Sequence, residues 1–242
     1  MTLGVIGGLG PMATAYFMQL VIKMTDANLD QEHLEMIIYN CPAIPDRTQY
    51  ILGNNSESPL PKMIEVGKKL KDQSVDYIAI PCITAHYFHK ELEEGIGVDI
   101  IHGIRETAEL LKASDVKKVG ILATDGTVNS KIFQDEIEKL GIKAVVPKSD
   151  MQNKVMSLIY DDVKKGNKPD LNSFFEIKKY MLEEEKVEAI ILGCTELSVI
   201  KRDYDLGDGV LDAMEVLASK AVTLCKKNLK PEYHKLFVPI SV

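Results

Sequence analysis

Two stretches of the sequence decide the fold, and the first is Asp76-Tyr77-Ile78-Ala79-Ile80-Pro81-Cys82-Ile83-Thr84-Ala85-His86. An apolar run that stops at a proline predicts a buried strand, which delivers Cys82 to a turn. Thr84 is placed to cap the helix that we expect to follow. The second stretch is Val187-Glu188-Ala189-Ile190-Ile191-Leu192-Gly193-Cys194-Thr195-Glu196-Leu197, where an apolar run again ends in a cysteine with a threonine close behind. This repetition suggests one site with two equivalent sulfur groups.

Each of these cysteines follows a strand and precedes a helix start, a position that favours the reactive thiolate. The positive end of the helix dipole and the free backbone N–H groups there stabilise the ionised sulfur. The alternative is that both are inert buried cysteines, which are common in protein cores. The repeated context favours a site for Cys82 and Cys194. Cys225 falls among the apolar positions of a helix expected over 209–227, so we interpret it as a core residue.

The order of strands and helices occurs twice along the chain. A buried strand and a glycine turn open the sequence at 3–11, and the same signals return at 118–127. Gly4 precedes Cys82 by 78 positions, and Gly120 precedes Cys194 by 74. This matched spacing indicates an internal duplication. Strands that alternate with helices predict parallel sheets, whose ligand sites lie at the carboxyl ends of the strands.

The expected fold class is therefore α/β, with two similar lobes, each a mainly parallel sheet flanked by helices, and an active site in the cleft between them. The first lobe is predicted to take residues 1–100 and to recover 208–242, because a parallel sheet needs helices on both faces. The second lobe takes residues 101–207. A fourth strand is expected over 98–101, and the loop 41–48 is expected to be irregular.

Composition excludes several kinds of partner. The chain has 242 residues, a hydrophobic fraction of 45%, a formal net charge of -7 and no block of basic residues. We expect a globular protein that binds neither nucleic acid nor a membrane. Its four cysteines have no zinc-type spacing, so no metal site is predicted. No basic region precedes the first apolar stretch, and we expect a cytoplasmic protein with reduced thiols.

Two motifs offer rival interpretations. Gly8-Leu9-Gly10-Pro11-Met12-Ala13 fits the G-x-G-x-x-A dinucleotide fingerprint, but the second strand ends at Tyr39-Asn40 without the acidic residue that the fingerprint needs. The second glycine turn, at 124–127, lacks the spacing too. His86 and His89 lie one helical turn apart and could bind a metal. No third ligand is visible, so a structural or exposed role is favoured for them.

Two places in the sequence carry cationic side chains that could bind an acidic substrate. Arg47 lies in the proline-rich loop after the second strand, on the same rim as Cys82. It is either a solvated surface charge or a fork that binds a carboxylate. Lys164 and Lys165 close a predicted helix, where they would also interact favourably with the helix dipole.

Taken together, these residues resemble the aspartate/glutamate racemase superfamily, and within it the aspartate racemase family. The match covers nearly the whole chain and rests on four motifs in the family's order: Gly4-Val5-Ile6-Gly7-Gly8-Leu9-Gly10-Pro11, Pro45-Asp46-Arg47-Thr48, Pro81-Cys82-Ile83-Thr84-Ala85-His86 and Gly193-Cys194-Thr195-Glu196-Leu197. Cell-wall glutamate racemases usually follow the second cysteine with Thr-His. Glu196 stands here instead, which favours the aspartate-type branch.

The resemblance implies a racemase without a cofactor that interconverts L- and D-aspartate, with glutamate as a further candidate, by a two-base mechanism. One cysteine removes the α-proton as a thiolate, and the other returns a proton to the opposite face as a thiol. Cys194 is implied to act on the L-form and Cys82 on the D-form. Lys165 is a close rival of Lys164 for the binding lysine. The implied substrate-binding residues are Arg47, Thr84, Thr124, Thr127, Lys164, Thr195 and Glu196, with the backbone of Ile83.

Ile83 departs from the family pattern, which usually has Asn between the first cysteine and the threonine. That amide helps to hold the α-carboxylate of the substrate, so backbone N–H groups or Thr84 must carry more of the task here. Alternatives therefore stay open: a non-catalytic amino-acid-binding protein, or a related isomerase with another substrate on the same fold. A homodimer is an open alternative to a monomer.

Overall fold

The structure is a computed structural model that describes residues 1–240, and the chain divides into two compact units. Unit 1 comprises Met1–Gly103 and Met214–Leu236, and unit 2 comprises Ile104–Ala213 and, at the end of the described chain, residues 237–240. Each unit contains a parallel sheet flanked by helices, which confirms the predicted α/β class and its two parallel sheets. No helix within residues 1–240 is long and apolar enough to cross a membrane.

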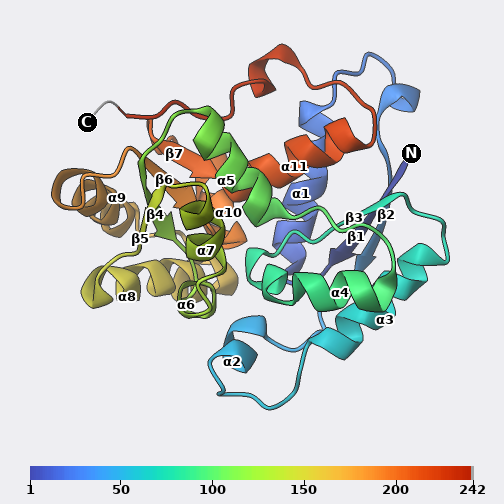
Figure 1. The fold of residues 1–242 in the computed structure, drawn as a ribbon, viewed down its shortest axis with the longest axis horizontal. Helices are drawn as coiled ribbons and strands as arrows, with labels where there is room; N and C mark the ends of the chain where they lie inside the picture. Colours follow the sequence, from blue (N-terminus) through green and yellow to red (C-terminus); the bar gives the residue numbers. More distant parts are fainter. Residues whose placement is uncertain (241–242) are drawn as a thin grey trace. The chain divides into compact units, whose positions relative to one another are not determined.

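The sheet of unit 1 has the strand order β2-β1-β3, with β1 (Thr2–Gly7) in the centre, between β2 (Glu35–Asn40) and β3 (Tyr77–Ala79). From its second residue on, β1 is buried throughout, as is typical of parallel strands covered on both faces. The helices α3 (Leu60–Lys71) and α4 (His89–Ile96) lie side by side against one face (Figure 1) and bury their apolar residues against this sheet. The packed sheet thereby fixes the positions of the turns that follow its strands.

The other elements of unit 1 connect these strands or cover the sheet. They are α1 (Pro11–Met24), α2 (Arg47–Ile51), α11 (Ala213–Leu224) and the 3₁₀ helices η1 (Asp30–Glu32), η2 (Ile83–Phe88) and η6 (Pro231–Tyr233). Helix α1 begins with Pro11, whose missing N–H costs nothing at that position.

The sheet of unit 2 has the order β5-β4-β6-β7. Its strands are β4 (Lys118–Leu122), β5 (Lys143–Val145), β6 (Ala189–Leu192) and β7 (Val210–Asp212). Every residue of β6 is fully buried. The helical elements are α5 (Gly103–Ala113), α6 (Asp125–Asn129), α7 (Ile132–Lys139), α8 (Ser149–Ser157), the π-helix η3 (Leu158–Asp162), the 3₁₀ helix η4 (Val163–Lys165), α9 (Leu171–Lys179), the π-helix η5 (Tyr180–Glu184) and α10 (Thr195–Asp203). Apolar residues of α8, α9 and α10 pack together with those of the strands.

The two sheets repeat one topology. In both, the first strand of the unit lies between the second and the third, and all pairs are parallel. A fourth chain segment follows in both: Ile100 forms a single parallel bridge beside β3, and β7 pairs with β6. A helix starts within three residues of Ile100 and of the end of β7, and at the start of that helix the chain passes from one unit to the other. The duplication therefore extends through the fourth strand position.

The C-terminal part of the repeat differs from the prediction. The helix expected over 209–227 begins only at Ala213, because Gly207 and Gly209 have φ values of +69° and +80° and no helix can start across them. The apolar residues after Gly209 enter the sheet as β7 instead. Residues 208–213 therefore belong to unit 2 and not to the first lobe, as do residues 237–240.

Two other expectations need correction. The strand expected over 98–101 is only the isolated bridge at Ile100. The loop 41–48 is ordered at its end, because α2 starts at Arg47.

Candidate functional site

Both predicted catalytic cysteines occupy the same position in their own units. Cys82 follows β3 and is the N-cap of η2, and Cys194 follows β6 and is the N-cap of α10. Both have extended backbones, with φ and ψ of -150° and 103° at Cys82 and of -137° and 134° at Cys194. Each cysteine is 6% exposed. The repeated sequence therefore builds the same strand–cysteine–helix turn twice.

The threonines behind the cysteines do not cap these helices. Thr84 lies inside η2 and is buried, and Thr195 is the first residue of α10 and is also buried. The prediction that Thr84 caps a helix is wrong, because Cys82 takes the N-cap position two residues earlier. Both threonine hydroxyls lie within the first turn that follows a cysteine.

The sulfur of Cys194 is hydrogen-bonded to a carboxylate. Its thiol donates to Oε2 of Glu196 at 2.8 Å, and the Thr195 hydroxyl lies 3.3 Å from the same oxygen. Burial raises the pKa of Cys194 well above its ordinary value, and the charge and hydrogen bond of Glu196 raise it further, while the charge of Lys164 opposes them. Cys194 is therefore a protonated thiol at neutral pH in this structure.

Cys82 has a different neighbour, His86, which holds its backbone. The Gly103 N–H donates to Nε2 of His86 at 3.1 Å, so the ring proton is assigned to Nδ1, which donates to the Cys82 carbonyl oxygen at 3.2 Å. Burial, together with the nearby His89, lowers the pKa of His86 to about 4. A neutral imidazole thus ties the Cys82 turn to the start of α5.

The histidines near this turn have structural partners. Nε2 of His89 lies 3.0 Å from the Ile100 carbonyl oxygen, and its Nδ1 lies 3.6 Å from the Glu93 carboxylate. The rings of His86, His89 and His102 lie 4.2–6.2 Å apart between centroids. Within residues 1–240, no three His, Cys, Asp or Glu side chains are grouped to hold a metal ion. A structural role for the His86–His89 pair fits these contacts.

Arg47 is not a solvated surface charge. It is 8% exposed, and its guanidinium donates to the carbonyl oxygens of Leu9 at 2.6 Å, Pro45 at 3.0 Å and Ile44 at 3.4 Å. These contacts join the loop after β2 to the glycine turn after β1. Because three carbonyls hold it, Arg47 has a fixed orientation at the carboxyl ends of two neighbouring strands.

The N-terminal glycine turn is filled by protein. Gly8 has a φ of +91°, and its N–H donates to the Thr14 hydroxyl at 2.9 Å. A Cβ atom at Gly8 would lie 2.4 Å from the Cys41 carbonyl carbon, and one at Gly7 would lie 2.4 Å from the Thr14 side chain. The glycines are thus required for close packing. In a dinucleotide-binding turn the Gly8 N–H would donate to a pyrophosphate, but here it donates to the Thr14 side chain. This geometry argues against the dinucleotide interpretation.

The corresponding turn of unit 2 carries two predicted substrate-binding residues. Thr124 is the N-cap of α6 and accepts a hydrogen bond from the Thr127 N–H at 3.3 Å. Their hydroxyls lie 3.2 Å apart, and both residues are buried. The structure brings this pair together at the carboxyl end of β4, next to the strand that delivers Cys194.

The two candidate lysines differ in their neighbours. Nζ of Lys165 forms an exposed ion pair with Asp161 at 2.8 Å. Nζ of Lys164 lies 3.9 Å from the centre of the Tyr160 ring, a cation–π contact, and its charge acts on Cys194. The geometry favours Lys164 over Lys165 as the lysine near the second cysteine.

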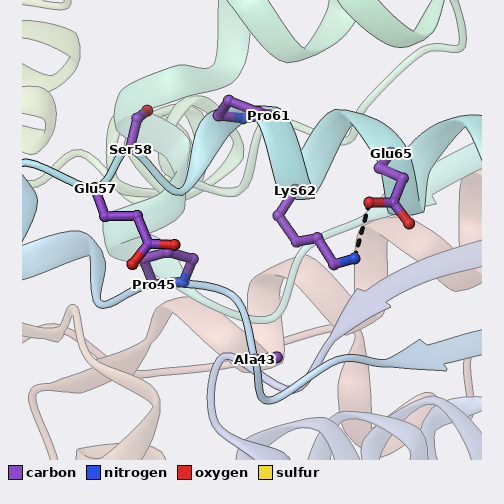
Figure 2. Close-up of a pocket in the computed structure, with 7 residues that line it drawn as sticks. All are labelled: Ala43, Pro45, Glu57, Ser58, Pro61, Lys62 and Glu65. Atoms are coloured by element: carbon purple, nitrogen blue, oxygen red, sulfur yellow. Dashed lines mark hydrogen bonds and ion pairs between the residues drawn. The ribbon is translucent and has the colours of Figure 1, made fainter.

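A pocket of about 560 Å³ lies beside the Arg47 loop in unit 1 (Figure 2). It is lined by Ala43, Pro45, Glu57, Ser58, Pro61, Lys62 and Glu65. Lys62 and Glu65 pair with each other at 2.8 Å, and hydrogen bonds from Lys62 and Lys69 lower the pKa of Glu65 to about 2. No predicted site residue lines this pocket, so the candidate site lies elsewhere.

The family profile described as Asp/Glu/Hydantoin racemase matches residues 6–221. The chain therefore belongs to the Asp/Glu/hydantoin racemase family, which confirms the resemblance seen in the four motifs. Its structure is similar to that of the Picrophilus torridus aspartate racemase, with a TM-score of 0.82 and 34% identity over 96% of this chain and 97% of that chain.

Two curated relatives are also racemases. The broad specificity amino-acid racemase RacX of Bacillus subtilis (strain 168) is 27% identical over 225 residues, which cover 91% of this chain and 96% of that protein. The glutamate racemase of Aquifex pyrophilus is 29% identical over 185 residues, or 74% of this chain and 70% of that protein. The relatives thus differ in the amino acid that their names give.

Two contacts at the site go beyond what the sequence analysis predicts. The spacing of His86 and His89 suggests a metal pair, but His86 lies four residues after Cys82 and binds the Cys82 carbonyl oxygen. The resemblance implies that Glu196 binds substrate, but it lies two residues after Cys194 and binds the sulfur. In both cases the spacing from the cysteine is the signal in the sequence.

Proposed function

We propose that this protein is a cofactor-independent amino-acid racemase that interconverts L- and D-aspartate. The observation that carries the proposal is the equivalence of Cys82 and Cys194, each the buried N-cap residue after the third strand of its sheet. Family membership supports racemisation, and the likeness to an aspartate racemase supports the substrate.

The proposed reaction uses the two cysteines as bases for opposite faces of one α-carbon. For the L-form, the Cys194 thiolate takes the α-proton and the Cys82 thiol protonates the other face; for the D-form the roles are exchanged. The α-proton is a very weak acid, so negative charge that develops on the α-carboxylate needs donors around it. Thr84, Thr195 and the backbone N–H groups at the starts of η2 and α10 are suited to this task.

The distal carboxylate is assigned to Arg47 and Lys164. Arg47 is held in place by three carbonyls, and such a preorganised guanidinium binds a carboxylate at a low entropic cost. Lys164 adds a positive charge whose field reaches Cys194. Together they would offset the net charge of -7 where an acidic substrate binds.

A second candidate function is racemisation of a different amino acid. Ile83 is 2% exposed and apolar at the position where the family usually has Asn. The B. subtilis relative is described as a broad specificity racemase. A panel of L-amino acids that includes aspartate, glutamate and neutral side chains distinguishes the two candidates by which α-proton exchanges fastest.

The test is α-proton exchange in heavy water without pyridoxal phosphate, followed by NMR and chiral chromatography. Wild-type protein should exchange and racemise L-aspartate. Cys82→Ser and Cys194→Ser should each lose net racemisation by at least about 10³-fold, because a serine hydroxyl stays protonated at neutral pH. Cys82→Ser should still exchange the L-form, and Cys194→Ser the D-form. Cys225→Ser, which changes the buried cysteine directly after α11, is the matched control and should stay active.

Two results would contradict this proposal. Near wild-type racemisation by either single mutant would exclude the two-cysteine mechanism. Binding of an amino acid by the wild-type protein with no exchange across the whole panel would instead favour a non-catalytic binding protein.

A further inference from the structure

We propose that Glu196 is the proton acceptor that converts the Cys194 thiol into the thiolate, rather than a ligand of the substrate. This inference rests on the proposed function, because it assigns a role within the half-reaction of Cys194 with the L-form.

The contact between the two side chains is direct. The thiol of Cys194 donates to Oε2 of Glu196 at 2.8 Å, so the proton that must leave the sulfur already points at a carboxylate oxygen. Glu196 is 8% exposed and Cys194 is 6% exposed, which leaves little room for water to serve as the acceptor. The Thr195 hydroxyl, 3.3 Å from the same Oε2, holds the carboxylate towards the sulfur.

The charges of the pair explain why a shared proton is preferred to a released one. Release of the thiol proton to water would leave a thiolate and a carboxylate in contact and buried, which is the reason why Glu196 raises the pKa of Cys194. Transfer from sulfur to oxygen keeps a single negative charge on the pair, so no further charge is buried. The charge of Lys164 also acts on the sulfur and stabilises the thiolate.

The proton inventory balances for the L-to-D direction. The S–H bond of Cys194 breaks and an O–H bond forms on Glu196, which gives a thiolate beside a neutral carboxylic acid. The thiolate then takes the α-proton of the L-form, and the C–H electron pair remains on the substrate. The Cys82 thiol gives its proton to the opposite face, and the new C–H bond completes the D-form. Exchange with water afterwards returns a proton to Cys82 and removes one from Glu196.

A role in substrate binding fits the contact less well. An ionised carboxylate would repel the two carboxylates of aspartate, and Oε2 is already taken by the sulfur and the Thr195 hydroxyl. The two roles also predict different results when Glu196 is neutralised, because a substrate ligand serves both enantiomers whereas a proton acceptor for Cys194 serves only one half-reaction.

The experiment combines Glu196→Gln with each cysteine mutant. Glutamine keeps the size of the side chain and an oxygen that can accept the hydrogen bond, but it cannot take the proton at neutral pH. Deuterium exchange of L-aspartate is measured in Cys82→Ser, and that of D-aspartate in Cys194→Ser, each with and without Glu196→Gln. We expect the ratio of L-form to D-form exchange to fall at least tenfold.

Alkylation of Cys194 by iodoacetamide, measured by peptide mapping against pH, separates proton transfer from simple electrostatics. Removal of the Glu196 charge should lower the pKa of Cys194 and make its alkylation faster. Proton acceptance by Glu196 therefore predicts faster alkylation together with slower L-form exchange. A rise in both rates would overturn the inference and leave Glu196 as a charge that only suppresses the thiolate.

The remaining outcomes also decide between the two proposals. An equal fall in L-form and D-form exchange would overturn the inference in favour of substrate binding. An unchanged L-form exchange would overturn the inference while the racemase function stands. Failure of both cysteine mutants, and of the wild-type protein, to exchange any aspartate would overturn the proposed function and the inference with it.

Discussion

The two cysteines share a backbone position but not a side-chain environment. At Cys82 a neutral histidine four residues later holds the carbonyl oxygen, whereas at Cys194 a carboxylate two residues later holds the sulfur itself. The strand and the turn are needed by each sheet, so the duplication preserves them. The residues just behind each cysteine contribute little to the sheet and can differ. The comparison teaches that the fold sets where each cysteine lies and that the few residues behind it set the contacts of its turn.

The largest effect expected at the Cys82 turn concerns stability in acid. Folding lowers the pKa of His86 from 6.5 to about 4, so between these values the unfolded chain binds a proton that the folded chain does not. Stability from the neutral ring is complete above pH 6.5 and is lost as the pH falls to 4. The full loss is about 3 kcal/mol, from 1.36 kcal/mol per pH unit.

Urea unfolding at pH 7 and at pH 4.5 measures this loss. His86→Gln should be less stable than wild type at pH 7, because the contacts with Cys82 and Gly103 change, but its stability should fall less on acidification. His234→Gln, which changes an exposed histidine, is the control and should keep the wild-type pH dependence. An identical acid loss in His86→Gln would show that His86 is not the titrating group.

We expect Arg47 to contribute both to substrate binding and to the stability of the fold, whereas a residue in an irregular loop would contribute little to stability. Truncating an arginine in an irregular loop costs little stability, but Arg47→Ala would deprive three carbonyls of a donor in this structure. We expect Arg47→Ala to lower the free energy of unfolding by about 2 kcal/mol, since unsatisfied buried acceptors cost about 1–3 kcal/mol. Its kinetics alone therefore cannot separate the two roles.

Arg47→Lys separates the roles better because it keeps the charge and removes the fork. A forked, charge-assisted contact contributes about 1.5–3 kcal/mol, which predicts a rise in the KM for aspartate of roughly 10- to 100-fold. Circular dichroism and thermal unfolding of the same variant monitor the fold. A variant that is less stable but has an unchanged KM for aspartate would show that Arg47 only holds the loop.

Local patterns made much of this fold predictable, and long-range contacts account for what was missed. The strands β1 and β6 are apolar runs bounded by glycine or cysteine, so periodicity was sufficient. Strand β7 has three residues, and its only strong signal is its pairing with β6, which a linear sequence does not display. The burial of Arg47 likewise depends on Leu9, 38 residues away.

A smaller effect is expected from Lys164 than from Arg47. Comparing Lys164 with Lys165 tests which charge acts on Cys194. Lys164→Gln removes a cation that lowers the pKa of Cys194, so that pKa should rise and the pH profile of Cys194 alkylation should shift to higher pH. The KM for aspartate should rise severalfold. Lys165→Gln removes only the exposed pair with Asp161 and is the matched control. Equal effects of Lys164→Gln and Lys165→Gln would contradict the assignment of Lys164 as the lysine that acts on Cys194.

The smallest effect is expected at Ile83, the residue between the first cysteine and its threonine. Ile83→Asn restores a side-chain donor for the α-carboxylate, and one hydrogen bond contributes about 0.5–1.5 kcal/mol, so kcat/KM for aspartate should rise by less than about tenfold. Because Ile83 is 2% exposed, the polar amide should cost about 1–3 kcal/mol of stability. Ile83→Val, which keeps an apolar β-branched side chain, controls for changes in packing and should not raise the rate. A loss of aspartate activity in Ile83→Asn, with a neutral amino acid as the best wild-type substrate in the exchange panel, would show that isoleucine fits this turn to a different ligand. The Cys82 side would then differ from the Cys194 side in substrate recognition as well as in side-chain contacts.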